Sequence, residues 1–213
     1  MKEPKVYVVT DRTIMSKPFA EKIADISASG ADMIILREKD LSASEYKYLA
    51  NECKAICTEY GVPLCINTFV DIAKDMEIGR VQLPLEVMRN LTDRTGLISI
   101  GVSVHSFEEA KEAVKLGADY LIAGPIYHTE CKPDAEPKGF GFIDELYRNF
   151  NVPVFGIGGI NAYNVRNIAS SGGSGICIRS SAMRIDNLNV LIRELKTNFR
   201  VGSEHLKIAG DFV

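Results

Sequence analysis

Several side chains that can carry out chemistry stand together after one apolar run of the chain. The run YLIA leads into the segment GPIYHTECKP (124–133), which contributes His128, Thr129, Cys131 and Lys132. Histidine has an unperturbed pKa near neutrality, so His128 can accept and return a proton at physiological pH. The charge of Lys132 can lower the pKa of Cys131 and make that thiol a second proton carrier. This composition favours the rim of a reaction site over a packed core.

Charged side chains follow a second apolar run, MIIL, in the same way. Arg37, Glu38, Lys39 and Asp40 come directly after it. Alternate residues of an extended chain lie on the same side, so Arg37 and Lys39 can both address one anion. A solvated turn uses the same residue types, and the position after a strand is what favours a binding role.

Glycines and serines follow two further apolar runs. PVFGIG ends in Gly158 and continues into Gly159, and GICI is followed by Arg179, Ser180 and Ser181. Glycine lets a backbone approach an anion closely, and backbone N–H groups at the start of a helix point toward it. Together Gly158, Gly159, Ser180 and Ser181 predict a site for a small phosphate ester.

Single polar residues follow other runs. Asn67 comes after PLCI and can either bind a ligand or cap a helix that begins near Val70. Ser103 follows ISIGV, and His105 comes two residues later. We interpret His105 as a structural histidine held by a hydrogen bond.

Eight short aliphatic runs, separated in most places by amphipathic stretches of helical period, must position these residues. The runs are VYVV (6–9), MIIL (33–36), PLCI (63–66), RVQL (80–83), ISIGV (98–102), YLIA (120–123), PVFGIG (153–158) and GICI (175–178). Runs this short without alternation predict strands buried on both faces, as in a parallel sheet. The clearest helices, 42–61 and 106–117, each open with a serine suited to the N-cap and close with a glycine suited to the C-cap.

The pattern predicts a single α/β domain, a (β/α)₈ TIM barrel of the phosphate-binding type over residues 1–198, with 199–213 as a C-terminal tail. The similar segments SGADMIIL, LGADYLIA and SGGSGICI indicate one repeated βα unit. A doubly wound sheet is the alternative, but no GxGxxG motif follows the first run. The chemistry of such barrels lies at the carboxyl ends of the strands, where the polar residues above stand.

Composition narrows the classes of partner. Charged residues make up 25% of the chain and the net charge is −3, so nothing favours nucleic acid or an anionic membrane, and any anion site must be local. The N-terminus lacks the pattern of a signal peptide, and no apolar run is long enough for a membrane span, which predicts a cytoplasmic protein. An odd number of cysteines, 5, argues against a disulfide framework.

The motifs resemble those of the thiamine phosphate synthase/TenI superfamily, and the likeness extends to about residue 197. The segments that carry it are YVVTDR, ILREKD, INTFVDIA, VSVHSFEEA, GADYLIAGPIY, VFGIGGI and GICIRSSA. The resemblance implies a phosphate-binding barrel that acts on the thiazole phosphate of thiamine biosynthesis, as a small-molecule partner. Related barrels are often homodimers.

The synthase branch of this superfamily joins a pyrimidine diphosphate to thiazole phosphate and releases diphosphate. Its motifs IND and HLGQED supply two aspartates that hold Mg²⁺, whereas INT and VQLPLEV here put Thr68 and Val87 near those positions. The residues that match the synthase pattern are Arg37, Lys39, Asn67, Ser103 and Lys132.

The TenI branch resembles the chain in VQLP, in SVHS and in the run Thr129-Glu130-Cys131-Lys132. TenI proteins are associated with a thiazole tautomerisation that moves a proton and needs no metal. On this hypothesis His128 shuttles the proton with Lys132 beside it, and Arg37 or Lys39 holds the substrate carboxylate. Asn67, Ser103 and Thr129 bind the substrate, although Pro125 stands where the TenI histidine usually is. A synthase, which alone would call for Mg²⁺, and a binding protein without turnover are the alternatives.

Overall fold

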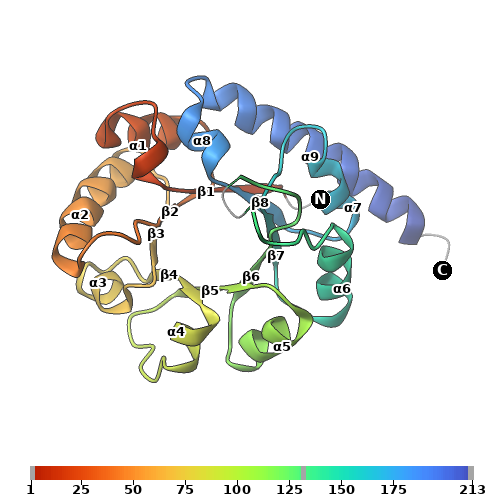
Figure 1. The fold of residues 1–213 in the computed structure, drawn as a ribbon, viewed down its shortest axis with the longest axis horizontal. Coiled ribbons are helices and arrows are strands. Elements are labelled where there is room, and N and C mark those ends of the chain that lie inside the picture. Colours follow the sequence, from red (N-terminus) through yellow and green to blue (C-terminus); the bar gives the residue numbers. More distant parts are fainter. Residues whose placement is uncertain (1–2, 131–132, 211–213) are drawn as a thin grey trace.

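Eight parallel strands close into a barrel in chain order, and β8 returns to pair with β1 (Figure 1). The computed structural model describes residues 3–130 and 133–210. The strands are β1 (Lys5–Val9), β2 (Met33–Leu36), β3 (Leu64–Asn67), β4 (Arg80–Pro84), β5 (Ser99–Val104), β6 (Tyr120–Ala123), β7 (Val154–Ile157) and β8 (Gly175–Ile178). The predicted TIM barrel is confirmed.

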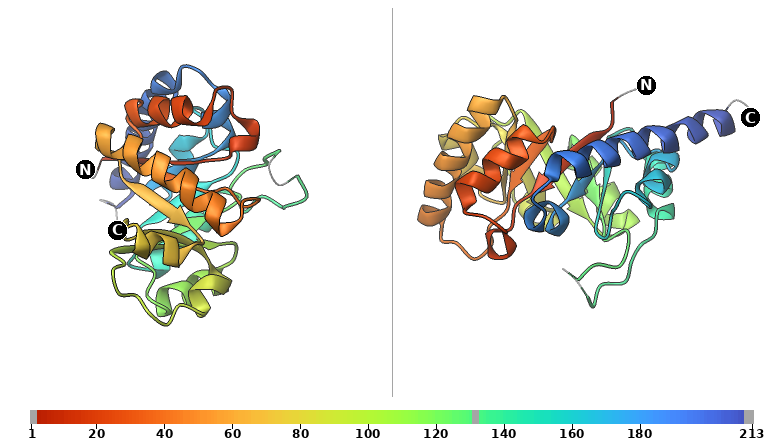
Figure 2. Two further views of the ribbon diagram at one scale, coloured as in Figure 1. Left: turned by 90° about the vertical axis from the view of Figure 1, so that its left-hand side faces the viewer. Right: turned by 90° about the horizontal axis from the view of Figure 1, so that it is seen from above.

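Helices surround the ring of strands on the outside (Figure 1). A 3₁₀ turn, η1 (Arg12–Ile14), follows β1. The helices are α1 (Phe19–Ala28), α2 (Ala43–Tyr60), α3 (Val70–Asp75), α4 (Leu85–Arg89), α5 (Phe107–Lys115), α6 (Gly141–Asn149), α7 (Val165–Ser170), α8 (Ser180–Arg184) and α9 (Leu188–Gly210). Figure 2 shows residues 124–130 and 133–140, between β6 and α6, extending from one end of the barrel.

The absence of alternation in the aliphatic runs follows from burial on both faces of each strand. All positions of β2, β3, β6 and β8 are buried. In β2, Ile34 packs with the helices, while Met33 and Ile35 belong to the cluster that fills the barrel. In that inner cluster the rings of Tyr7 and Phe155 stack with centroids 4.3 Å apart.

The predicted helix caps are present. Ser42 and Glu45 form a capping box at the start of α2, and Gly61 ends that helix in the left-handed conformation with a φ of 68°. Ser106 accepts a hydrogen bond from the backbone N–H of Glu109 at the start of α5. Five strands, β1, β3, β4, β5 and β7, differ from their predicted bounds by one or two residues. Because β3 ends at Asn67 and β5 at Val104, Asn67 and Ser103 lie within their strands and not after them.

Helix α9 crosses the predicted boundary between barrel and tail at residue 198 without a break. It lies along the side of the barrel beside α7 and extends past it (Figure 2). Phe199 is buried, and a side chain at Gly202 would overlap the backbone carbonyl of Arg166 in α7. Packing on α7 therefore continues the helix where the sequence suggested only a tail.

Asp32 ties α9 to the amino-terminal end of the barrel. Its carboxylate accepts the backbone N–H of Val6 at 2.8 Å and forms ion pairs with Lys196 of α9 at 2.8 Å and Lys5 at 3.0 Å. Partial burial acts to raise the pKa of Asp32, but the hydrogen bonds from Lys196, Val6 and Lys5 outweigh it, and the pKa is lowered.

The lowered pKa of Asp32 predicts a pH-dependent contribution to stability. The folded chain favours the ionised form of Asp32, because its pKa is lower there than in the unfolded chain, where it is about 4. The contribution of Asp32 to stability is therefore complete above the unfolded pKa and is lost as pH falls through the folded pKa. We expect Asp32→Asn to cost about 1–3 kcal/mol at pH 7. Urea unfolding of both proteins should show the difference shrinking toward pH 3; an equal difference at both pH values would contradict the assignment.

Among the described residues, no helix is both long and apolar enough to cross a membrane.

Candidate active site

A cavity of about 300 Å³ lies at the carboxyl ends of the strands, and every strand contributes to its lining. This volume falls within the range of small-molecule sites. The predicted residues that line it are Arg37, Lys39, Asn67, Ser103, Thr129, Gly158, Gly159, Ser180 and Ser181. His128 is exposed and is not part of the lining, and Lys132 lies outside the described residues. Most of the residues predicted from their positions at the carboxyl ends of the strands therefore meet in one cavity.

The segment after β2 presents Arg37 and Lys39 to the cavity and turns Glu38 the other way. Glu38 is 3% exposed and accepts hydrogen bonds from the Thr10 hydroxyl at 2.6 Å and from the Arg12 backbone N–H at 3.0 Å. Thr10 Oγ1 in turn accepts the backbone N–H of Arg37 at 2.9 Å. Burial raises the pKa of Glu38, although the bonds from Thr10 and Arg12 oppose the shift. Glu38 therefore fixes the backbone from which the two cations project.

Removal of this buried carboxylate should loosen both strand ends. We expect Glu38→Ala to cost about 1–3 kcal/mol of stability, because the Arg12 N–H and the Thr10 hydroxyl lose their buried acceptor. Glu38→Gln keeps an acceptor oxygen of the same reach and should retain most of the stability. Denaturant unfolding of the two variants checks this, and equal losses in both would contradict the role of the acceptor.

Neighbouring strands connect Asn67 to Ser103 through Gln82. Asn67 Nδ2 donates to the Gln82 backbone carbonyl at 2.8 Å, and Gln82 Nε2 donates to Ser103 Oγ at 3.0 Å. Asn67 does not cap α3, whose N-cap, Phe69, makes no side-chain hydrogen bond. Since Ser103 Oγ accepts from Gln82, its own hydroxyl hydrogen can be donated to a ligand. Gln82 lines the cavity but was missed as a site residue, because its role depends on a contact across strands.

The β6 loop is held against the strand 7 glycines. Gly158 and Gly159 have φ values of 98° and 64°, a conformation that favours glycine. A side chain at Gly159 would overlap the backbone carbonyl of His128. His105 donates its Nδ1–H to the carbonyl of Gly124, as expected of a structural histidine, and also lines the cavity. The loop backbone thus packs over the predicted phosphate site.

Arg179 is a second residue that the sequence analysis did not select. It directly precedes Ser180, lines the cavity, and forms an ion pair with Asp11 whose atoms Nε and Oδ2 are 3.9 Å apart. The cationic residues of the described lining are then Arg37, Lys39 and Arg179, and that lining contains no aspartate or glutamate. The cavity is suited to ligands that carry several negative charges.

The residues present do not fit a bound Mg²⁺ ion. Hard cations of this kind are held by carboxylate oxygens, and Thr68 and Val87 stand near the positions where the synthase motifs carry aspartates. Among the side chains of residues 3–130 and 133–204, no group of three or more His, Cys, Asp or Glu is placed to hold a metal ion. Thr68 also has a φ of 71°, which is unusual for a β-branched residue and typical of functional sites.

A family model, curated relatives and a solved structure that are similar to this chain all carry thiamine phosphate synthase or pyrophosphorylase names. A family model described as thiamine monophosphate synthase matches residues 6–182. The thiamine-phosphate synthase of Syntrophomonas wolfei is 34% identical over 198 residues, covering 90% of this chain and 94% of the relative. That of Pyrococcus abyssi is 34% identical over 197 residues, covering 90% and 93%. The structure of thiamine phosphate pyrophosphorylase from Pyrococcus furiosus matches with a TM-score of 0.81 at 32% identity, covering 94% of this chain and 98% of that one.

The relatives named above are synthases, so the comparisons favour the synthase alternative over the TenI branch to which several motifs pointed. The family model spans most of the chain, and the relatives are covered over nearly their whole length. The chain belongs to the thiamine monophosphate synthase/TenI family, whose members act in thiamine biosynthesis.

Proposed function

We propose that this chain is a thiamine-phosphate synthase, which joins a pyrimidine diphosphate to thiazole phosphate and releases diphosphate. The observation that carries the proposal is the lining of the cavity. Arg37, Lys39, Asn67 and Ser103, which match the synthase pattern, meet there, whereas His128, the base of a tautomerase, is exposed and outside it. The synthase names of relatives with about one third identical residues support the same choice.

The cavity offers a separate group for each charged part of the two substrates. Gly158, Gly159, Ser180 and Ser181 would bind the phosphate of the thiazole, as predicted from their strand ends. The departing diphosphate gathers negative charge as its bond breaks, and Arg37 and Lys39 would stabilise that charge. The Ser103 hydroxyl, oriented by Gln82, would donate a hydrogen bond to a substrate ring.

Thiazole tautomerisation is the second candidate, and the absence of acidic residues from the described lining favours it. That reaction needs no metal, and the same cations would hold the phosphate and carboxylate of its substrate. His128 would then have to reach the ring from its exposed position on the loop. A thiazole-phosphate-binding protein without turnover would use the same cavity.

An activity assay with two sets of substrates tests these alternatives. One set contains thiazole phosphate and pyrimidine diphosphate, and the other contains the non-aromatic carboxythiazole phosphate. We expect thiamine phosphate from the first set, and His128→Ala should keep its rate within about threefold, since His128 lies outside the cavity lining. Aromatisation that is lost in His128→Ala would instead establish the tautomerase. Thermal stabilisation by thiazole phosphate with no product in either set would indicate a binding protein.

A further inference from the structure

Arg179 adds a third cation to the cavity, on the other side of β1 from Arg37 and Lys39. Strand β1 pairs with β2 on one side and with β8 on the other. Arg37 and Lys39 follow β2, and Arg179 follows β8, so the cations flank the carboxyl end of β1 from both neighbours. The Arg179 side chain is 19% exposed, and it belongs to the lining of the cavity and not to the outer surface.

The ion pair with Asp11 orients Arg179 without neutralising it. Asp11 Oδ1 accepts hydrogen bonds from the Thr13 backbone N–H at 3.3 Å and from the Thr13 hydroxyl at 2.6 Å, which commits this carboxylate to the start of η1. Its other oxygen faces Arg179 Nε at 3.9 Å, at the limit of an ion pair and longer than a charge-assisted hydrogen bond. The guanidinium therefore keeps most of its capacity to bind a further anion.

We propose that Arg179 binds the anionic phosphate groups of the substrates, and that Arg37, Lys39 and Arg179 together hold diphosphate without a divalent cation. The positive charge that Mg²⁺ would bring is supplied by the protein, in a cavity whose described lining has cations and no carboxylate. A guanidinium can bind two phosphate oxygens at once in a fixed geometry. The proposal rests on the proposed function, because it names how that site holds its leaving group.

Binding of inorganic diphosphate to the purified chain tests this directly. Isothermal titration is run in EDTA and again with excess Mg²⁺. We expect the wild-type protein to bind diphosphate in EDTA, with a Kd no more than about threefold weaker than in Mg²⁺. Arg179→Met should weaken binding at least about tenfold in EDTA, and Arg179→Lys should restore part of it. Arg193→Met, an exposed substitution of the same kind on α9, should bind as the wild type does.

Two results would overturn the proposal: diphosphate binding that requires Mg²⁺, or a folded Arg179→Met variant that binds as the wild type does. Thermal unfolding of each variant identifies any loss that comes from misfolding, and Arg179→Lys keeps the test open if the methionine variant fails to fold. Thiamine phosphate formed only with Mg²⁺ would leave the proposed function standing and remove this inference. Metal-free diphosphate binding that depends on Arg179, with no thiamine phosphate formed, would uphold the anion site and remove the proposed function.

Discussion

Replacing Arg37 with methionine should lower kcat/KM for thiamine phosphate formation by about 100- to 1,000-fold, the loss typical of removing one group that stabilises charge in a transition state. Arg37 lines the cavity, and its backbone N–H is fixed by Thr10 at 2.9 Å. Negative charge grows on the departing diphosphate, so the guanidinium is worth more in the transition state than in the bound substrates. Most of the loss should therefore appear in kcat, with a smaller rise in KM.

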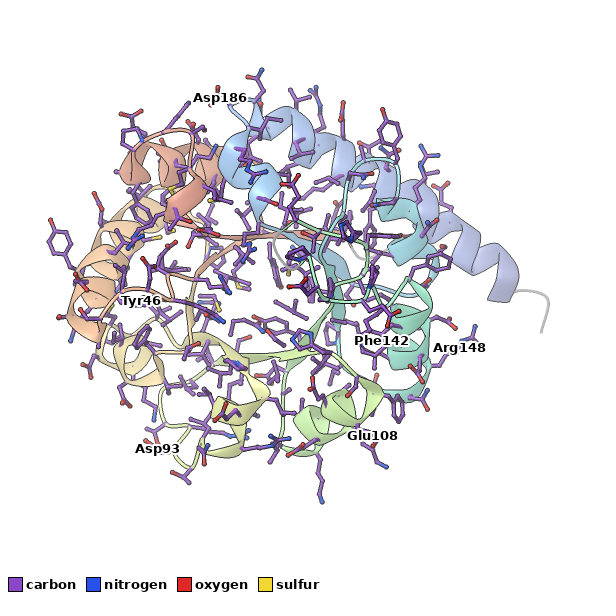
Figure 3. The ribbon with its side chains drawn as sticks, in the orientation of Figure 1. Tyr46, Asp93, Glu108, Phe142, Arg148 and Asp186 are labelled. Atoms are coloured by element: carbon purple, nitrogen blue, oxygen red, sulfur yellow. The ribbon has the colours of Figure 1, made fainter. Side chains whose placement is uncertain are left out.

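A matched substitution on the surface separates this loss from a general effect of removing an arginine. Arg148 lies on the outer side of α6, away from the centre of the barrel (Figure 3), and its side chain is 71% exposed in an ion pair with Asp144. Arg148→Met should keep the wild-type kcat/KM within about twofold. Steady-state kinetics of both variants, with thermal unfolding to show that they are folded, make the comparison. A loss in Arg37→Met confined to KM would mean that Arg37 only binds substrate.

The fold was predictable because local and global signals agree along this chain. The run MIIL corresponds to β2 residue for residue, and the serine and glycine that bracket α2 form the expected caps. A barrel built from one repeated unit then needs no long-range information beyond the order of its strands. The position of Arg37, Lys39 and Asn67 at the carboxyl ends of β2 and β3 is enough to predict that they line the cavity.

The residues that were missed are those whose roles depend on contacts between strands. Gln82 acts by donating to Ser103 on the next strand, and nothing in the motif VQLP specifies that bond. Arg179 stands beside the predicted Ser180, but its relation to Asp11 depends on the pairing of β8 with β1. The β6 loop has no periodicity that could predict the exposure of His128, whose backbone carbonyl lies close to Gly159. Helix α9 likewise continues beyond residue 198 because of its contact with α7.

Gly101 connects the packing of the barrel to the geometry of the cavity. A methyl group at this position of β5 would overlap both the ring of Tyr120 and the side-chain Oε1 of Gln82. The ring has little room to move, because it contacts the rings of Tyr7 and Phe155 with centroid separations of 5.9 and 5.6 Å. The displacement must therefore fall largely on Gln82, which is 3% exposed and orients Ser103.

We expect Gly101→Ala to lower the free energy of unfolding by about 3 kcal/mol, toward the upper end of the usual cost of overpacking, and to lower Tm by about 10 °C. Because Gln82 would be pushed away from Ser103, the folded variant should also bind thiazole phosphate more weakly, by about tenfold. Urea unfolding and calorimetric titration below the lowered Tm measure the two effects separately. Unchanged stability would mean that Tyr120 and Gln82 can shift to make room for the methyl group at little cost.

Gly141 offers a control for the same substitution at an uncrowded position. It is exposed at the start of α6, and an added methyl group there would meet no atom within 4 Å. Gly141→Ala should raise the free energy of unfolding by about 0.5 kcal/mol, because alanine restricts the unfolded chain and favours a helix. If the free energy of unfolding falls in Gly101→Ala and rises in Gly141→Ala, the loss at Gly101 comes from the crowded interior. A loss at both positions would point to a general cost of replacing glycine and not to the crowding around Gly101.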